Sequence, residues 1–146
     1  MLCAHVEPGA RPFATLFVIE DYLGLASGLV ACRTCGTTWL LELIDLSGGS
    51  RAFRVASVEP GHAAAMIRTL TRGTCDINRA RGEIENLETR SPLQPVVLTM
   101  AADVVLGVQA VPLAEVPRAH WLALPCDGQW LASDGYVRTR GSEERP

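Results

Sequence analysis

Two cysteines separated by two residues constrain the fold of this chain more than any other feature of its sequence. Cys32 and Cys35 are followed directly by Gly36. Two thiolates at this spacing bind one metal ion when the backbone turns tightly, and a glycine after the second cysteine allows the left-handed conformation that the turn needs. Backbone N–H groups in such a loop can also point at the sulfur atoms. The segment therefore predicts a metal-binding loop.

A redox pair is the main alternative for Cys32 and Cys35. A thioredoxin-like pair opens a helix after a strand, whereas residues 37–40 (TTWL) are good strand formers. Inert buried thiols are a third alternative. The residues that follow the pair favour the metal site.

Two further ligands are needed, because a structural Zn²⁺ takes four. Cys3 and His5 lie ahead of the first expected strand, and a hairpin over residues 14–31 would return the chain beside them. The alternative is that these two residues are an untethered end with no role. We predict a zinc site formed by Cys3, His5, Cys32 and Cys35.

The order of these features resembles a zinc ribbon, in which a ligand pair, a β-hairpin and a CxxCG knuckle lead into another strand. The resemblance covers residues 3–45; the sequence CRTCG fits the knuckle, while Cys3-x-His5 stands where a ribbon usually has a second CxxC. The resemblance implies a structural metal that organises the module, with contacts to nucleic acid or protein as its usual uses.

Hydrophobic periodicity predicts an α+β fold with an N-terminal antiparallel meander, two central helices and C-terminal hairpins. The strands of the meander, with a turn at residues 47–50, are expected at residues 14–20, 25–31, 37–46 and 51–58. Helices are expected from Pro60 to a cap at Gly73 and over residues 76–87. Residues 91–95 are expected to break the chain, and residues 96–113 to form two strands with a turn near residue 102, or else one long bent strand.

The end of the chain completes a single domain over residues 1–137, which includes the zinc-ribbon-like module at residues 1–58. Residues 121–132 contain Asp127-Gly128, a tight-turn dipeptide that predicts a hairpin. Residues 138–146 are polar and predict a frayed tail.

Composition restricts the class of protein. Hydrophobic residues make up 48% of the 146 residues and charged residues 20%, which excludes a disordered chain, and no apolar run is long enough to span a membrane. Five cysteines without an export signal predict a reduced, cytoplasmic setting. All the basic residues are arginine, a usage typical of a high-GC bacterial genome, and the net charge of −3 disfavours nucleic acid as a partner.

An enzyme is the least favoured reading. Cys75 precedes an expected helix and stands in C-x5-R spacing with Arg81, but the segment between them has no glycine and begins with Asp76, which would repel an anion. A buried structural cysteine is the better interpretation of Cys75. His62 is expected on the surface of a helix, and His120 and Cys126 have no assigned role.

The remaining charged residues do not form a recognisable site. Arginines and acidic residues alternate along residues 68–88, which predicts a solvated, ion-paired helical face. Common catalytic and nucleotide-binding motifs are absent from the sequence.

Three functions follow in order of preference. The first is a small zinc-binding protein that acts through a protein partner or its own oligomer, with a structural metal. The second is a nucleic-acid-associated zinc-ribbon regulator. The third is an enzyme that uses Cys75 or an open position on the metal.

Overall fold

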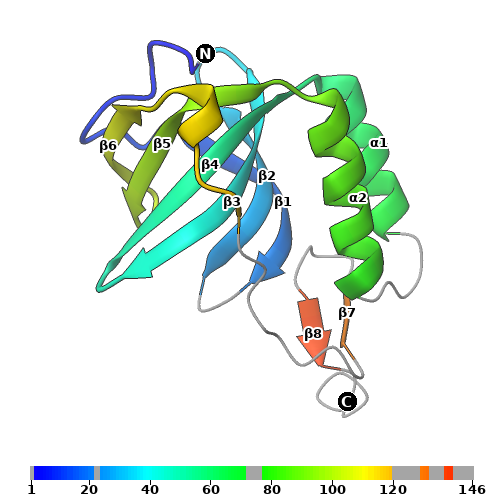
Figure 1. Ribbon diagram of the computed structural model, residues 1–146. Helices are drawn as coiled ribbons and strands as arrows, with labels where there is room; N and C mark the ends of the chain where they lie inside the picture. Colours follow the sequence, from blue (N-terminus) through cyan, green and yellow to red (C-terminus); the bar gives the residue numbers. More distant parts are fainter. Residues whose placement is uncertain (1, 22–23, 72–76, 120–128, 132–136, 140–146) are drawn as a thin grey trace.

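The computed structural model describes the backbone of residues 2–21, 24–71, 77–119, 129–131 and 137–139. Six strands form one antiparallel sheet in the order β1-β2-β3-β4-β5-β6, and two helices separate the fourth strand from the fifth (Figure 1). The strands and helices of this sheet-and-helix unit are β1 Phe13–Asp21, β2 Leu25–Cys32, β3 Thr38–Ser47, β4 Ser50–Val58, α1 Pro60–Thr71, α2 Ile77–Arg90, β5 Leu93–Ala101 and β6 Val104–Ala110. The α+β class predicted from the sequence is therefore observed.

The first four strands form the expected meander, and each lies within two residues of its predicted bounds. Strand β3 is paired on both sides, with Leu41 opposite Gly28 of β2 and Val55 of β4. Residues 38–43 are buried without alternation because both faces of the sheet are covered here. This double coverage explains why the sequence of β3 is apolar at consecutive positions.

Helices α1 and α2 cover one face of the sheet (Figure 1). The core beneath them joins Leu29 and Leu40 of the strands to Met66 and Leu70 of α1 and Ile84 of α2. These side chains are at most 4% exposed. Their spacing along each helix is the three- and four-residue repeat that the sequence predicted.

The other face of the sheet curves around a second core. Trp39, Phe53, Val55 and Leu98 belong to this core and are at most 2% exposed. The N-terminal segment helps to close the curved sheet, because its residues 9 and 10 exchange backbone hydrogen bonds with Val105 of β6. The N–H of Gly9 donates to Val105 O at 2.7 Å, and the N–H of Val105 donates to Ala10 O at 2.9 Å.

The segment at residues 91–95 differs from its prediction. It was expected to break the chain, but β5 already begins at Leu93 and includes Pro95. The ladder between β4 and β5 shifts register between Arg54 and Ala56, close to the pairing of Ala56 with Leu93. Proline is tolerated at such irregularities because the missing N–H removes no regular ladder bond. The two-strand prediction for residues 96–113 is confirmed, with β5 and β6 joined at Ala102 and Asp103.

Near the end of the chain, β7 (Gln129–Leu131) pairs with β8 (Val137–Thr139) in a separate two-stranded sheet. The first strand and the turn of the hairpin predicted around Asp127-Gly128 lie outside the described residues, and residues 129–131 of its second strand pair with residues 137–139. Strand β8 also includes the first two residues of the expected tail. The rest of that tail, residues 140–146, lies outside the described residues. The division into one domain stays a prediction.

A further helix of one turn, η1 (Leu113–Glu115), follows β6. Among the described residues, no helix is long and apolar enough to cross a membrane.

Candidate metal centre

The pairing of β1 with β2 brings the two ends of the predicted zinc module together. Phe13 at the start of β1 is the partner of Cys32 at the end of β2. One residue further, the N–H of Arg33 donates a hydrogen bond of 2.7 Å to the carbonyl of Pro12. The hairpin therefore returns the chain to the N-terminal segment, as the sequence predicted.

The loop between β2 and β3 has the geometry of a metal-binding knuckle. The N–H of Gly36 donates to Cys32 O at 2.9 Å, and the N–H of Cys32 donates to Thr37 O at 2.8 Å. Gly36 has φ +76°, the left-handed conformation expected for it. The N–H of Thr34 points at Cys32 Sγ at 3.4 Å, so the predicted backbone donor to sulfur is present.

Cys3 and His5 are held beside this loop by the packing of their neighbours. The N–H of Val6 donates to Cys3 O at 3.1 Å, which closes a tight turn around the pair. Val6 is buried in the second core, and Leu2 packs against the same core. The segment is therefore anchored on both sides of the two candidate ligands and is not an untethered end.

The four candidate ligand atoms gather around one point. The three sulfur atoms and an imidazole nitrogen of His5 all lie within 4.8 Å of one another. Zn–S bonds of about 2.3 Å in a tetrahedral site place two sulfur atoms about 3.8 Å apart. The four atoms therefore lie at most about one ångström further apart than the sulfur atoms of a closed tetrahedral site. Cys3, His5, Cys32 and Cys35 could hold a metal ion together.

The surroundings of the thiols differ in a way that suits a shared cation. Burial, together with hydrogen bonds to Cys35 and Cys32, raises the pKa of Cys3 to about 11, while a backbone hydrogen bond at His5 opposes the shift. Hydrogen bonds from the side chain and backbone of Thr37 lower the pKa of Cys35 to about 6; Thr37 Oγ1 lies 3.1 Å from Cys35 Sγ. The free thiols thus lie close together. A bound cation would stabilise them as thiolates, including Cys3, whose burial otherwise disfavours the charged form.

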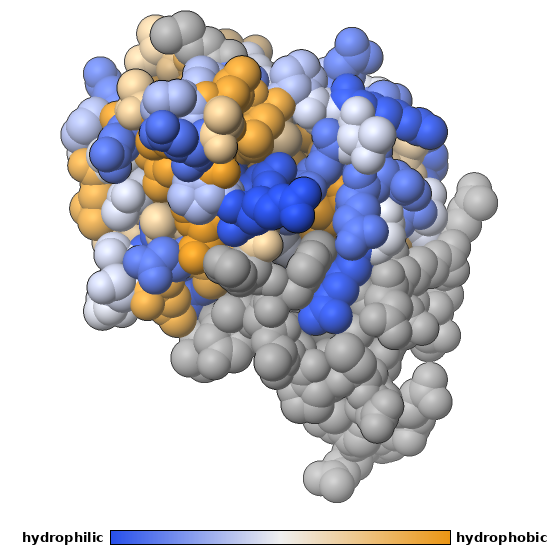
Figure 2. All heavy atoms as spheres, viewed as in Figure 1, coloured by the Kyte–Doolittle hydropathy of each residue, from blue (hydrophilic) through white to orange (hydrophobic). Residues whose placement is uncertain are grey.

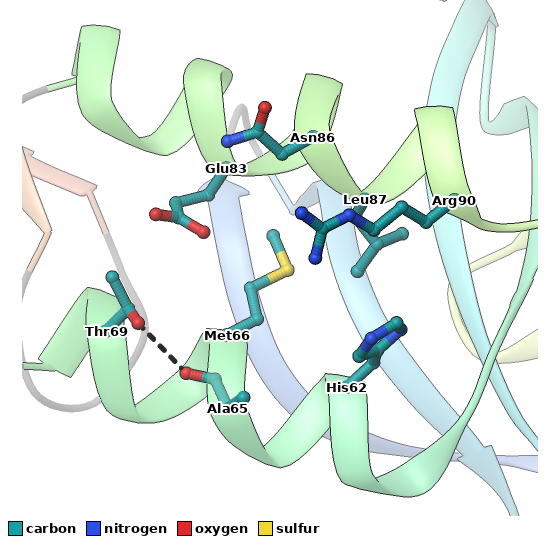
Figure 3. A pocket seen from close by; sticks show the side chains of 8 residues that line it. All are labelled: His62, Ala65, Met66, Thr69, Glu83, Asn86, Leu87 and Arg90. Atoms are coloured by element: carbon teal, nitrogen blue, oxygen red, sulfur yellow. Dashed lines mark hydrogen bonds between the residues drawn. The ribbon is translucent and has the colours of Figure 1, made fainter.

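The other histidine in the described chain lies elsewhere. His62 is exposed on the first turn of α1, as expected, and lines a small hollow between the two helices with Met66, Glu83, Leu87 and Arg90 (Figure 3). The hollow has a volume of about 150 Å³.

Three further residues considered from the sequence, Cys75, His120 and Cys126, lie outside the described residues. The enzyme hypothesis that used Cys75 therefore stays untested.

The charged face predicted along residues 68–88 is ion-paired, as expected, but Arg81 and Glu88 on it are not fully solvated. Arg81 and Glu88 of α2 turn toward the sheet, where their side chains are 24% and 25% exposed. Arg81 Nε lies 3.9 Å from Glu20 Oε1, and Arg54 Nη2 lies 3.5 Å from Glu88 Oε2. The solvated interpretation holds for Glu85, which is exposed.

These charges belong to a buried ionic row that the sequence analysis missed. Glu20, Ser27, Glu42 and Arg54 are consecutive partners across β1, β2, β3 and β4. The carboxylates of Glu20 and Glu42 are 3% and 4% exposed. A glutamate inside the apolar run of β3 was the available signal, because a buried carboxylate needs a partner from another element.

Comparisons with known proteins add no family to these observations. No protein-family model, no curated protein and no solved structure matches the chain.

Proposed function

We propose that this chain is a small zinc-binding protein whose metal is structural and which acts by binding a protein, in the first instance a second copy of itself. The observation that carries the proposal is the convergence of three thiols and one imidazole within 4.8 Å. These four donors come from two segments that are about thirty residues apart in the sequence and meet at one end of the curved sheet.

The donor set supports zinc and a structural role. Three thiolates and one imidazole form a Cys₃His set, which is common in structural zinc sites, and thiolates select zinc over magnesium or calcium. A catalytic zinc keeps one coordination position for water, whereas four protein ligands would fill a tetrahedral site. The ion would tie the N-terminal segment to the β2–β3 loop and so fix the end of the sheet.

The surface of β6 supports self-association. This strand ends the six-stranded sheet, and Leu106 and Val108 on it are 49% and 36% exposed. Leu113 in η1 is 56% exposed. Figure 2 shows that hydrophobic side chains gather over the sheet, whereas the visible helix surface is mainly hydrophilic. Residues 9 and 10 pair with β6 at Val105, and beyond that point a terminal strand with exposed apolar side chains is a template for pairing with another chain.

Light scattering after size-exclusion chromatography tests the proposal. We expect the zinc-loaded parent to have the mass of a dimer and the double variant Leu106→Glu/Val108→Glu to have the mass of a monomer with its zinc retained. Leu16→Glu is the matched control, because Leu16 is 43% exposed on β1 at the other end of the sheet order. A parent that is folded, monomeric and free of metal would contradict the proposal.

A further inference from the structure

One sulfur of the Cys/His cluster is open to solvent. Cys35 is exposed, Cys3 is half-buried and Cys32 is buried. Cys35 lies in the loop between β2 and β3, whose residues 33–37 are all exposed. Oxidants attack cysteines that combine exposure with thiolate character, and a cysteine that binds a metal does so as a thiolate. Cys35 is therefore the sulfur of the cluster that an oxidant in solution meets first.

The backbone of the loop already holds Cys32 and Cys35 at the separation of a disulfide pair. The N–H of Gly36 donates to Cys32 O at 2.9 Å, which closes one turn with the hydrogen bond of an α-helix. Such a turn places the Cα atoms of its first and fourth residues, here Cys32 and Cys35, about 5 Å apart. Disulfides join residues whose Cα atoms are about 4.4–6.8 Å apart, so this pair needs no movement of the backbone.

Cys32 has the position of a resolving thiol, the second sulfur that completes a disulfide. Its side chain belongs to the second core and is 3% exposed, which shields it from an oxidant in solution. The N–H of Thr34 donates to Cys32 Sγ at 3.4 Å, so this sulfur lies beside the loop that carries Cys35. The sulfur atoms of Cys32 and Cys35 are within 4.8 Å of each other. Cys32 is thus reached from Cys35 rather than from solvent.

We propose, on the basis of the zinc site of the proposed function, that a hydroperoxide oxidises Cys35 and Cys32 to a disulfide and that the chain thereby releases its zinc ion. Disulfide sulfur no longer carries the negative charge that binds the cation, so Cys3 and His5 remain as two ligands where a structural zinc takes four. The metal centre is then a peroxide-sensitive switch.

The reaction consumes one peroxide for the two thiolates. The Cys35 sulfur attacks one peroxide oxygen, the O–O bond breaks, and a sulfenic acid forms while hydroxide leaves. The Cys32 sulfur then attacks the Cys35 sulfur, the S–S bond forms, the S–O bond breaks, and a second hydroxide leaves. The two thiolates give up two electrons, which reduce the peroxide to two hydroxide ions.

Release of the ion does not require the chain to unfold, because the N-terminal segment has attachments that do not involve the metal. Val6 is buried in the second core, and residues 9 and 10 exchange backbone hydrogen bonds with Val105 of β6. Cys3 and His5 thus stay beside the loop, and reduction of the disulfide restores the set of four ligands.

Zinc release from the full-length, zinc-loaded protein in excess hydrogen peroxide tests the proposal, with a chromogenic zinc chelator as the readout. We expect about one zinc per chain to be released while far-UV circular dichroism stays unchanged. Reduction with a phosphine, followed by added zinc, should restore the original zinc content.

Two histidine substitutions separate the Cys32–Cys35 pair from the other thiols. Cys3→His and Cys35→His each leave two cysteines and two histidines, a ligand set that also binds zinc, and zinc content before oxidation checks that both variants are loaded. Cys3→His keeps both members of the pair and should release zinc at the rate of the parent. Cys35→His lacks the exposed thiol and should release zinc on the order of tenfold more slowly.

Peptide mapping of oxidised Cys3→His identifies the bond itself. Trypsin cleaves after Arg33, between the two cysteines, so the two flanking peptides stay joined under non-reducing conditions only through Cys32 and Cys35. We expect this linked species after oxidation and not before.

The proposal is overturned if the zinc-loaded parent keeps its zinc in peroxide, if Cys35→His releases zinc as fast as Cys3→His does, or if oxidised Cys3→His yields no linked peptides. None of these results would affect the zinc site itself. A parent that holds no zinc before oxidation would contradict the proposed function, and this proposal with it.

Discussion

The substitution Glu42→Gln addresses the buried ionic row between the sheet and α2. Glu42 Oε1 lies 3.4 Å from Arg54 Nε, and Arg54 also contacts Glu88. A single guanidinium is thus placed between two carboxylates. Burial is the largest cause that raises the pKa of Glu42 from 4.5 to about 9, and the hydrogen bond and charge of Glu88 come next. The charge of Glu20, which lies beside Arg81, also raises this pKa, whereas the charge of Arg54 lowers it. We therefore expect Glu42 to be protonated in the folded protein at neutral pH.

The magnitude follows from the difference in bound protons. Between pH 4.5 and about 9 the folded state holds one proton more at Glu42 than the unfolded state does. The contribution of Glu42 to stability is therefore fully present below pH 4.5 and is lost as the pH rises toward 9. Its slope is about 1.4 kcal/mol of unfolding free energy per pH unit. Glutamine cannot ionise, so Glu42→Gln lacks this contribution to the slope.

Urea denaturation followed by circular dichroism at pH 5, 6, 7 and 8 measures the effect. We expect the stability of Glu42→Gln relative to the parent to increase by about 1.4 kcal/mol per pH unit over this range. Glu85→Gln is the control, because it removes a carboxyl group that is exposed on α2, away from the buried row. A difference for Glu42→Gln that is constant, or that falls as the pH rises, would show that Glu42 is ionised and stabilised by Arg54.

Two further substitutions test the knuckle and the core. Gly36→Ala should lower the unfolding free energy of the metal-loaded protein by about 1 kcal/mol, because φ is +76° at this position and a Cβ is strained in that conformation. Gly49→Ala is the control; this position has no positive φ, and the substitution should have little effect in the same urea titration. Leu40→Ala should lower the unfolding free energy by about 2–5 kcal/mol, because Leu40 of β3 is fully buried in the core beneath the helices. Leu46→Ala is the control on the same strand; Leu46 is 40% exposed, and its substitution should change the unfolding free energy by less than about 0.5 kcal/mol. Equal losses for the two members of either pair would refute the structural explanation.

The local elements could be predicted because their signals lie within short stretches of sequence. The Ser47–Ser50 turn places the two strands that flank it in register, and the hydrophobic spacing in α1 follows directly from its contact with the sheet. The metal cluster could also be predicted, since a hairpin of known length returns Cys32 to the segment that carries Cys3 and His5.

Long-range pairings carried no such signal. The pairing of β4 with β5 spans both helices, and the inclusion of Pro95 in β5 depends on a register shift that only the partner strand reveals. The forward pairing of β7 with β8 likewise depends on a partner beyond the Asp127-Gly128 turn signal.

Tertiary packing also reversed one local prediction. Arg81 and Glu88 occupy helix positions that look solvated when α2 is considered alone, because their charges alternate with others along the helix. Their orientation is explained by the buried carboxylate of Glu20 and the buried Arg54, which lie on strands far away in the sequence.

The central claim is that Cys3, His5, Cys32 and Cys35 bind one zinc ion. Elemental analysis of protein purified without added metal tests it most directly, on the parent, on the single variants Cys3→Ser, His5→Ala, Cys32→Ser and Cys35→Ser, and on His62→Ala as the histidine control. We expect about one zinc per chain in the parent and in His62→Ala, and much less in the four ligand variants. A parent without zinc, or ligand variants that keep the parent's zinc content, would contradict the claim.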